Sequence, residues 1–240
     1  MNRSVWSSCL AAAVLACLCA SGGPLVANTA TAPAPRDGEW WTGRHNAMNE
    51  RVKQGNVDLI FVGDSITQGW EGNGKEIWKE YYGSRNAVNL GIGGDRTQHV
   101  LWRLQNGNLE GIAPKLAVIM IGTNNSGDNT AEEIAEGTKA IVEALRSKSP
   151  ETKILLLATF PRGPNPQDAR RQVNEKSNEI VAKLADGKMV RYLDIGKSFL
   201  SPNGDLTREI MPDLLHLSPQ GYKIWAEAIE PVVAEVVGEK

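Results

Sequence analysis

Cysteine is scarce in this sequence, and the three that occur (Cys9, Cys17 and Cys19) all lie in its N-terminal segment. If that segment is removed from the mature protein, the rest can form no disulfide, thiol nucleophile or cysteine metal site. The domain must then be stabilised by its core. No spacing of His, Glu and Asp matches a metal site either. We therefore expect neither a metal nor a cofactor.

An excess of charge of one sign is also lacking, because 26 Lys and Arg face 28 Asp and Glu, for a formal net charge of −2. No basic stripe indicates nucleic acid as a partner, and no acidic block resembles a solvating tail. The 240 residues are enough for one domain with a sizeable core. No repeat and no second domain boundary are present.

The N-terminus has the composition of a targeting segment. Arg3 precedes a largely apolar, alanine-rich run over residues 5–20, and small residues follow it. This pattern predicts a secretory signal peptide over residues 1–27, since the run is short for a membrane span. We expect a secreted or periplasmic protein with no membrane span after signal removal. The expected cleavage site follows Ala27, and Ala20 and Ala30 also fit; lipoprotein anchoring at residues 14–17 (VLAC) is the alternative.

The rest of the chain has the pattern of an α/β domain. Residues 28–38 are rich in Ala, Thr and Pro and are predicted to be a flexible lead-in to a domain over residues 39–240. In that domain, apolar runs alternate with helical patterns, which predicts a three-layer α/β/α sandwich with a mainly parallel sheet of about five strands. The expected strands are residues 58–63, 87–90, 116–121, 153–158 and 190–195.

Two helix starts carry capping signals. Thr130 and Glu133 have the spacing of a capping box. Ser218 followed by Pro219 predicts the start of the last helix, with serine as the cap and proline at the first position.

Residues 59–69 (LIFVGDSITQG) organise the domain. An unbroken apolar run of this kind suits a strand buried on both faces, and Gly63 then permits a sharp turn. Ser65 falls just past the carboxyl end of this strand, which is the edge where open α/β sheets bind ligands. Ser65 is therefore a candidate nucleophile, although Ser and Asp are also common in turns and helix caps.

Polar motifs follow three other expected strands, so a doubly wound sheet can bring their loops together with Ser65. Acyl transfer by serine needs a base, a group that orients the base, and donors for the oxyanion. His216 can act as the base and Asp213, three residues earlier, can orient it. The backbone N–H groups of Ser65 and Gly94 and the side-chain amide of Asn124 can serve as oxyanion donors.

The motifs that carry these residues resemble those of the SGNH, or GDSL-type, hydrolases. Residues 91–104 (GIGGDRTQHVLWRL), 122–125 (GTNN) and 215–217 (LHL) most resemble the catalytic subunits of intracellular platelet-activating-factor acetylhydrolase and their bacterial esterase relatives. The resemblance implies a flavodoxin-like fold, a triad of Ser65, Asp213 and His216, and an oxyanion hole of Ser65, Gly94 and Asn124. It also implies an acyl pocket closed by Ile66, Thr123 and Leu215, and it suggests a homodimer.

Several residues compete with these assignments. The chain has three histidines, so His45 and His99 are the rivals of His216; Asp194 and Asp205 are weaker rivals of Asp213 because they lack its spacing to His216. Asn125 adjoins Asn124, and the superfamily pattern selects Asn124. Trp40 and Trp41 fit either core packing, which we favour, or a sugar platform.

The sequence therefore predicts an exported serine esterase that removes short acyl groups, chiefly acetyl, from a sugar or a similar small ester. Two alternatives remain. One is a carbohydrate-binding protein that kept the fold without catalysis, and the other is a lipid acetylhydrolase. The export signal argues against a cytosolic phospholipid role.

Overall fold

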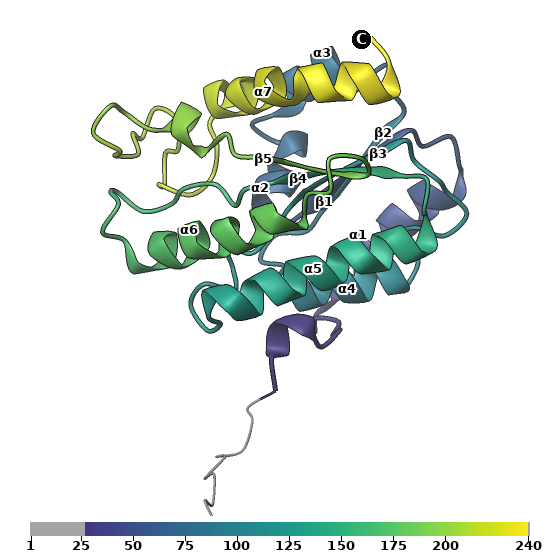
Figure 1. Ribbon diagram of the computed structural model, residues 1–240. Coiled ribbons are helices and arrows are strands. Elements are labelled where there is room, and N and C mark those ends of the chain that lie inside the picture. The colour runs from purple at the N-terminus through teal and green to yellow at the C-terminus, as the bar shows by residue number, and fades with distance from the viewer. Residues whose placement is uncertain (1–26, 240) are drawn as a thin grey trace, which may run out of the picture.

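A computed structural model describes residues 27–239 (Figure 1). Its centre is a five-stranded parallel sheet in the order β2-β1-β3-β4-β5. This confirms the predicted sheet, and each strand lies within about two residues of its expected bounds. The strands are β1 (Leu59–Gly63), β2 (Ala87–Gly91), β3 (Leu116–Met120), β4 (Lys153–Leu157) and β5 (Val190–Leu193).

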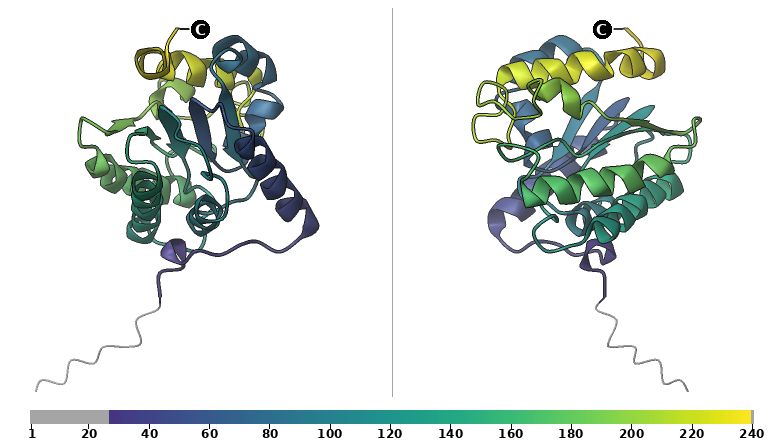
Figure 2. Two further views of the ribbon diagram at one scale, coloured as in Figure 1. Left: turned by 90° about the vertical axis from the view of Figure 1, so that its right-hand side faces the viewer. Right: turned by 60° about the vertical axis from the view of Figure 1, so that its left-hand side comes forward.

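Helices cover both faces of the sheet, as predicted (Figures 1 and 2). Four pack on one face: α1 (Glu39–Lys53), α4 (Thr97–Gln105), α5 (Ala131–Lys148) and α6 (Ala169–Val181). The other face carries α3 (Lys75–Tyr82) and α7 (Pro219–Val237). Short helices complete the chain: α2 (Ser65–Gln68), η1 (Thr29–Thr31), η2 (Gly69–Glu71), η3 (Ala182–Leu184) and η4 (Gly196–Phe199).

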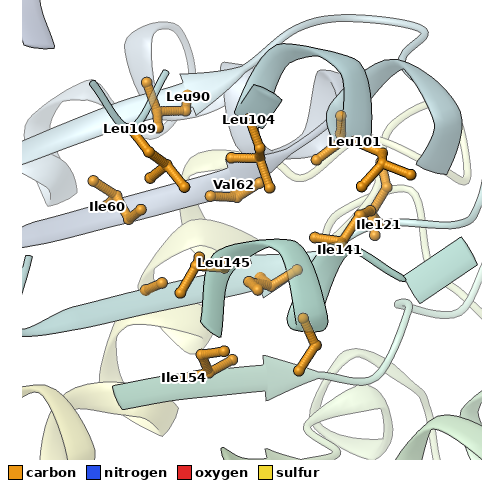
Figure 3. Close-up of a cluster of buried hydrophobic side chains, with 14 of the residues drawn as sticks. Ile60, Val62, Leu90, Leu101, Leu104, Leu109, Ile121, Ile141, Leu145 and Ile154 are labelled. Atoms are coloured by element: carbon orange, nitrogen blue, oxygen red, sulfur yellow. The ribbon is translucent and has the colours of Figure 1, made fainter. Parts of the chain in front are cut away.

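Alternate residues of β1 divide the core into two clusters. Ile60 and Val62 point to the cluster shared with α1, α4 and α5, which is shown in Figure 3. Phe61 points to the opposite cluster, which it shares with Trp70 and Trp225. Because both faces of β1 are buried, its sequence is a continuous apolar run rather than an alternating one. This rigid strand delivers Ser65 to its carboxyl end.

Both predicted helix caps are present. The Thr130 hydroxyl accepts a hydrogen bond from Glu133 N (3.2 Å), and the Glu133 carboxylate accepts one from Thr130 N (3.0 Å). The Ser218 hydroxyl accepts a hydrogen bond from Gly221 N (3.3 Å), and Pro219 follows it as the first residue of α7. The second cap fixes the chain immediately after His216.

The lead-in, whose composition predicts flexibility, makes specific contacts with α4 and α5. Ala30 is fully buried, and its carbonyl accepts a hydrogen bond from the Thr97 hydroxyl of α4 (2.8 Å). This close approach needs a glycine on α5, because a Cβ at Gly137 would lie 2.6 Å from the Ala30 oxygen. Asn28 anchors the same segment to Glu136 of α5 (2.8 Å). Figure 2 shows the segment, in purple, running past these helices to the start of α1.

Residues 1–26 of the predicted signal peptide lie outside the described residues. Between residues 27 and 239, no helix has the length and apolar character that a membrane span requires.

Candidate active site

Ser65 is placed by the sharp turn between β1 and α2. Gly63 is required there, because a Cβ at this position would lie 2.4 Å from the Met120 carbonyl oxygen of the neighbouring strand. Asp64 caps α2 by accepting a hydrogen bond from Ile66 N (2.9 Å). Ser65 is consequently the first residue of α2, partly exposed at the carboxyl edge of the sheet.

Ser65, His216 and Asp213 form one hydrogen-bonded chain. His216 Nε2 lies 2.8 Å from Ser65 Oγ, and its Nδ1 lies 2.6 Å from Asp213 Oδ2. The other carboxylate oxygen of Asp213 accepts hydrogen bonds from the backbone N–H groups of His216 (2.7 Å) and Leu215 (3.1 Å). The three-residue spacing thus closes a tight turn, in which Leu214 has a φ of +61°.

Two opposing effects act on the Asp213 carboxyl. Partial desolvation raises its pKa, whereas the hydrogen bonds and the charge of His216 lower it. The second effect is the larger, so the pKa of Asp213 lies below its usual value. Asp213 is therefore ionised at neutral pH, as a group that orients an imidazole must be.

Gly94 and Asn124, the other predicted oxyanion donors, lie on the loops that follow β2 and β3. Gly94 has a φ of +76°, which favours glycine. The Asn124 amide donates to the Asp95 carbonyl oxygen (2.9 Å) and so ties the two loops together. Gln68 of α2 accepts a hydrogen bond from Gly93 N (2.7 Å), which links the Gly94 loop to the helix that begins at Ser65. These bonds directly join three of the four predicted loops, and the hydrogen bond between His216 and Ser65 joins the fourth.

Asp95 is a buried anchor that the sequence reasoning missed. It is completely buried, and its carboxylate accepts hydrogen bonds from Arg103 Nε (2.8 Å) and Trp41 Nε1 (2.8 Å). Arg103 also donates to the Gly63 carbonyl oxygen (3.3 Å), just before the turn that carries Ser65. The eight-residue spacing of Asp95 and Arg103 gives no local signal of this pairing.

Arg36 of the lead-in also reaches this loop. Its Nη1 donates to the Gly93 carbonyl oxygen (2.6 Å) and to Asp95 Oδ1 (3.3 Å). The Gly93 carbonyl and the Gly94 N–H belong to the same planar peptide group. Arg36 therefore holds and polarises the peptide whose N–H is the predicted oxyanion donor.

Asp64 was also absent from the predicted site. It is completely buried beside Ser65, and its Oδ2 has no hydrogen-bond partner. Burial and, to a smaller extent, the nearby charge of Asp95 raise the pKa of the Asp64 carboxyl to about 7. The hydrogen bond from Ile66 N lowers this pKa but does not offset the effect of burial.

The three predicted acyl-pocket residues have different surroundings. Ile66 is buried in the apolar cluster on the α7 side of the sheet, and Leu215 packs against that cluster while remaining partly exposed. Thr123 is buried, and its hydroxyl accepts hydrogen bonds from Arg162 (3.1 Å) and Asn174 (3.2 Å). Their role as an acyl pocket stays a prediction.

The rival histidines have other partners. His45 is buried and stacks on Trp41, with ring centroids 5.6 Å apart. His99 Nδ1 accepts a hydrogen bond from Arg96 N (3.0 Å), and burial lowers the pKa of His99 to about 4.

The rival carboxylates and Asn125 are also engaged elsewhere. Asp194 accepts a hydrogen bond from Gly196 N (2.8 Å), and Asp205 accepts one from the side chain of Asn203 (2.7 Å). Asn125 is buried, and its side-chain oxygen accepts a hydrogen bond from Thr97 N (3.0 Å).

The adjacent tryptophans do not share one role. Trp41 belongs to the core, as predicted, with only 2% of its surface exposed. The prediction of core packing is wrong for Trp40, which is 58% exposed. The part of the chain that the structure describes contains no cluster of three or more His, Cys, Asp or Glu that could hold a metal ion.

The fold and the family match are those of an SGNH-type carboxylic ester hydrolase, as the sequence motifs predicted. The chain belongs to the GDSL-like Lipase/Acylhydrolase family, whose model matches residues 61–224. It is 40% identical over 203 residues to platelet-activating factor acetylhydrolase IB subunit alpha2 of Rattus norvegicus, covering 83% of this chain and 86% of the relative. It is 37% identical over 218 residues to subunit alpha1 of Pongo abelii, covering 88% and 92%.

Solved structures support the fold. A carbohydrate acetylesterase family member from Sinorhizobium meliloti superposes with a TM-score of 0.59 at 18% identity, covering 76% of this chain and 99% of that one. This likeness shows that the two chains share a fold.

Proposed function

We propose that this chain is an exported serine esterase that removes short acyl groups, chiefly acetyl, from a hydroxyl of a sugar or similar small alcohol. One observation carries the proposal: His216 lies within hydrogen-bond distance of both Ser65 Oγ (2.8 Å) and Asp213 (2.6 Å). A serine, its base and the group that orients the base are thereby aligned at the ligand-binding edge of the sheet.

In the proposed first half-reaction, Ser65 Oγ attacks the ester carbonyl carbon while His216 Nε2 takes the hydroxyl proton. The tetrahedral intermediate carries negative charge on the former carbonyl oxygen. It collapses when the carbon–oxygen bond to the alcohol breaks, and His216 gives its proton to the departing alcohol oxygen. Asp213 stabilises the imidazolium and keeps Nδ1 protonated throughout.

In the second half-reaction, water attacks the acyl-Ser65 ester and His216 again takes a proton. Collapse of the second intermediate releases the carboxylic acid and returns the proton to Ser65 Oγ. The backbone N–H groups of Ser65 and Gly94 and the amide of Asn124 stabilise the oxyanion in both halves. Asn124 donates to Asp95 in the free protein and would turn part of this capacity toward the substrate.

The short acyl group follows from the residues next to the catalytic groups. Ile66, Thr123 and Leu215 are each one peptide bond from Ser65, Asn124 or His216, and we expect the bulky or branched side chains there to leave room for few carbons. Support for an acetyl group also comes from the names of the curated acetylhydrolase relatives. Those names favour a lipid acetylhydrolase as the second candidate function. The signal-peptide pattern of residues 1–27 instead supports an exported enzyme.

Labelling with a fluorophosphonate probe tests the proposal, because such probes react with an activated serine. We expect stoichiometric labelling of the wild type and none of Ser65→Ala. Ser201→Ala, which removes another serine hydroxyl that accepts a hydrogen bond, is the matched control and should label fully. A folded wild-type protein that takes no label would instead support a carbohydrate-binding protein on this fold.

A further inference from the structure

Trp40 is the one large apolar side chain that is mostly exposed within residues 27–239. A single exposed aromatic residue carries little information by itself. Its position is informative, because it lies at the start of α1, directly after the lead-in, and close to the Gly94 loop. Core packing is the wrong prediction for Trp40, whereas its neighbour Trp41 is buried and donates a hydrogen bond to Asp95.

Gly93 separates the Trp40 ring from the nucleophile. A Cβ added at Gly93 would lie 3.7 Å from Trp40 Cη2 and also 3.7 Å from the Ser65 Cβ. Unlike Gly94, Gly93 does not have the positive φ that would demand glycine. A Cβ there would also lie 3.2 Å from Gln68 Oε1, so the missing side chain leaves room both for that contact and between Ser65 and the indole.

Trp40 also lines a cavity of about 710 Å³ between α1 and α3, beside the edge strand β2. This volume lies within the range of about 300–1,000 Å³ that is typical of small-molecule sites. Trp40 is the residue that the space beside Gly93 and the cavity share, since Ser65 and Gly93 do not themselves line the cavity. Extension of the ester's alcohol part over Gly93 and along the indole into the cavity is therefore a step of the proposal below.

The cavity lining combines apolar and ionic side chains. Met48 and Trp78 provide apolar surface. Arg44 and Glu71 also line it and form a two-fold hydrogen-bonded ion pair, with distances of 2.9 and 2.8 Å. A sugar ring suits this mixture, since its C–H face can stack on an indole while its hydroxyls bond to the charged groups. An alkyl chain would instead remove water from those charges and would offer no hydrogen bonds in place of the ones lost.

We propose that Trp40 and this cavity bind the alcohol part of the substrate, and that this part is a saccharide of more than one sugar unit. The proposal rests on the proposed esterase function, to which it adds a second subsite and a substrate class. Trp40 acts here as a specificity residue that holds the leaving group, and it takes no part in the acyl-transfer steps.

Two esters separate the subsite from the chemistry. Ethyl acetate has no group that can reach the cavity, whereas acetylated xylotetraose does, and acid release from both can be followed by titration. Trp40→Ala should lower kcat/KM for acetylated xylotetraose by about tenfold or more, the loss expected for one aromatic stacking contact and its buried area. The same variant should change ethyl acetate hydrolysis by less than about twofold, and Trp40→Phe should retain most of the oligosaccharide activity.

A second pair of variants fills the cavity without removing any contact. Ala47 is exposed on α1 and lines the cavity, whereas the neighbouring exposed Asn46 does not. Ala47→Phe should reduce oligosaccharide hydrolysis, and Asn46→Phe should leave it unchanged. Ser65→Ala, titrated with acetylated xylotetraose in a calorimeter, should bind it, and the double variant with Trp40→Ala should bind it at least about tenfold more weakly.

Each contrary result has a separate meaning. If the wild type hydrolyses neither ester and takes no fluorophosphonate label, the proposed function itself is wrong. If it hydrolyses ethyl acetate and Trp40→Ala reduces both esters equally, or Ala47→Phe has no effect, the subsite is refuted while the esterase remains. If hexadecyl acetate, rather than the oligosaccharide, shows the sensitivity to Trp40→Ala and Ala47→Phe, the cavity binds an alkyl chain and the saccharide proposal is overturned.

Discussion

Replacing Arg36 with alanine would remove a cation that lies far from the nucleophile in sequence but acts on the Gly94 loop. In this variant the Gly93 carbonyl oxygen loses its 2.6 Å hydrogen bond. The Asp95 carboxylate loses one of its three side-chain donors and keeps Trp41 and Arg103. The Gly93–Gly94 peptide is then free to rotate, and its N–H no longer points at a fixed place. Transition-state stabilisation should fall more than ground-state binding, because an oxyanion donor acts on charge that develops during the reaction.

The size of the effect follows from burial. Hydrogen bonds to charged groups contribute about 1.5–3 kcal/mol. The Arg36 side chain is 31% exposed, so solvent screens part of that interaction. We expect a loss of about 1–2 kcal/mol, which is a fall of roughly five- to thirtyfold in kcat. The Michaelis constant for p-nitrophenyl acetate should change less.

The matched control for Arg36→Ala is Arg96→Ala. Arg96 is exposed to a similar degree, 34%, and adjoins the same loop, but its guanidinium pairs with Asp128. This control should keep kcat within about twofold of the wild type. Arg36→Lys, which keeps the charge and one donor, should recover part of the lost rate. If Arg36→Ala keeps wild-type kcat but lowers the melting temperature, Arg36 stabilises the fold and does not position the Gly94 peptide.

Three further predictions concern the catalytic groups and their neighbours. Asn124→Ala should reduce kcat by roughly 10²–10³-fold with a smaller change in KM; a fall in affinity at unchanged kcat would show that Asn124 binds ground-state substrate. Activity on nitrophenyl esters should decline from acetyl to butyryl and nearly vanish at eight carbons, and Leu215→Ala should widen this range; a wild type that prefers octanoate to acetate would contradict the narrow pocket. Asp64 holds a proton in the folded state up to about pH 7 but loses it near pH 4 when unfolded, so its contribution to stability falls as pH rises through this window. Urea unfolding should therefore show Asp64→Asn to be more stable than the wild type at pH 8 but not at pH 4, and equal differences at both would show that Asp64 does not titrate in this way.

The sheet and much of the candidate site could be predicted because their signals are local. Residues 59–62 form a strand with both faces buried, and a continuous apolar run is sufficient to indicate it. The turn that joins Asp213 to His216 likewise depends on a spacing of three residues, which the sequence displays directly. The caps at Thr130 and Ser218 are equally local.

The parts that could not be predicted depend on contacts between distant residues. Arg36 meets Gly93 across 57 positions, and its own neighbours form a Pro- and Ala-rich segment with the composition of a linker. The docking of that segment depends on the absence of a Cβ at Gly137, which sequence patterns do not relate to Ala30. Trp40 and Trp41 differ because successive helical residues point about 100° apart, so only one of them can face the core.

The docked lead-in also bears on how the protein is produced. A recombinant version that starts at Glu39 would keep the whole sheet, every helix from α1 to α7 and all the residues that we expect to touch the ester. It would nevertheless lack Arg36 and expose the surfaces of α4 and α5 that Ala30 covers. An affinity tag placed at the C-terminus, which Figure 1 shows at the end of α7, avoids that surface entirely. We therefore expect the smallest fully active version of this enzyme to begin upstream of α1, within the Pro- and Ala-rich segment that has the composition of a linker.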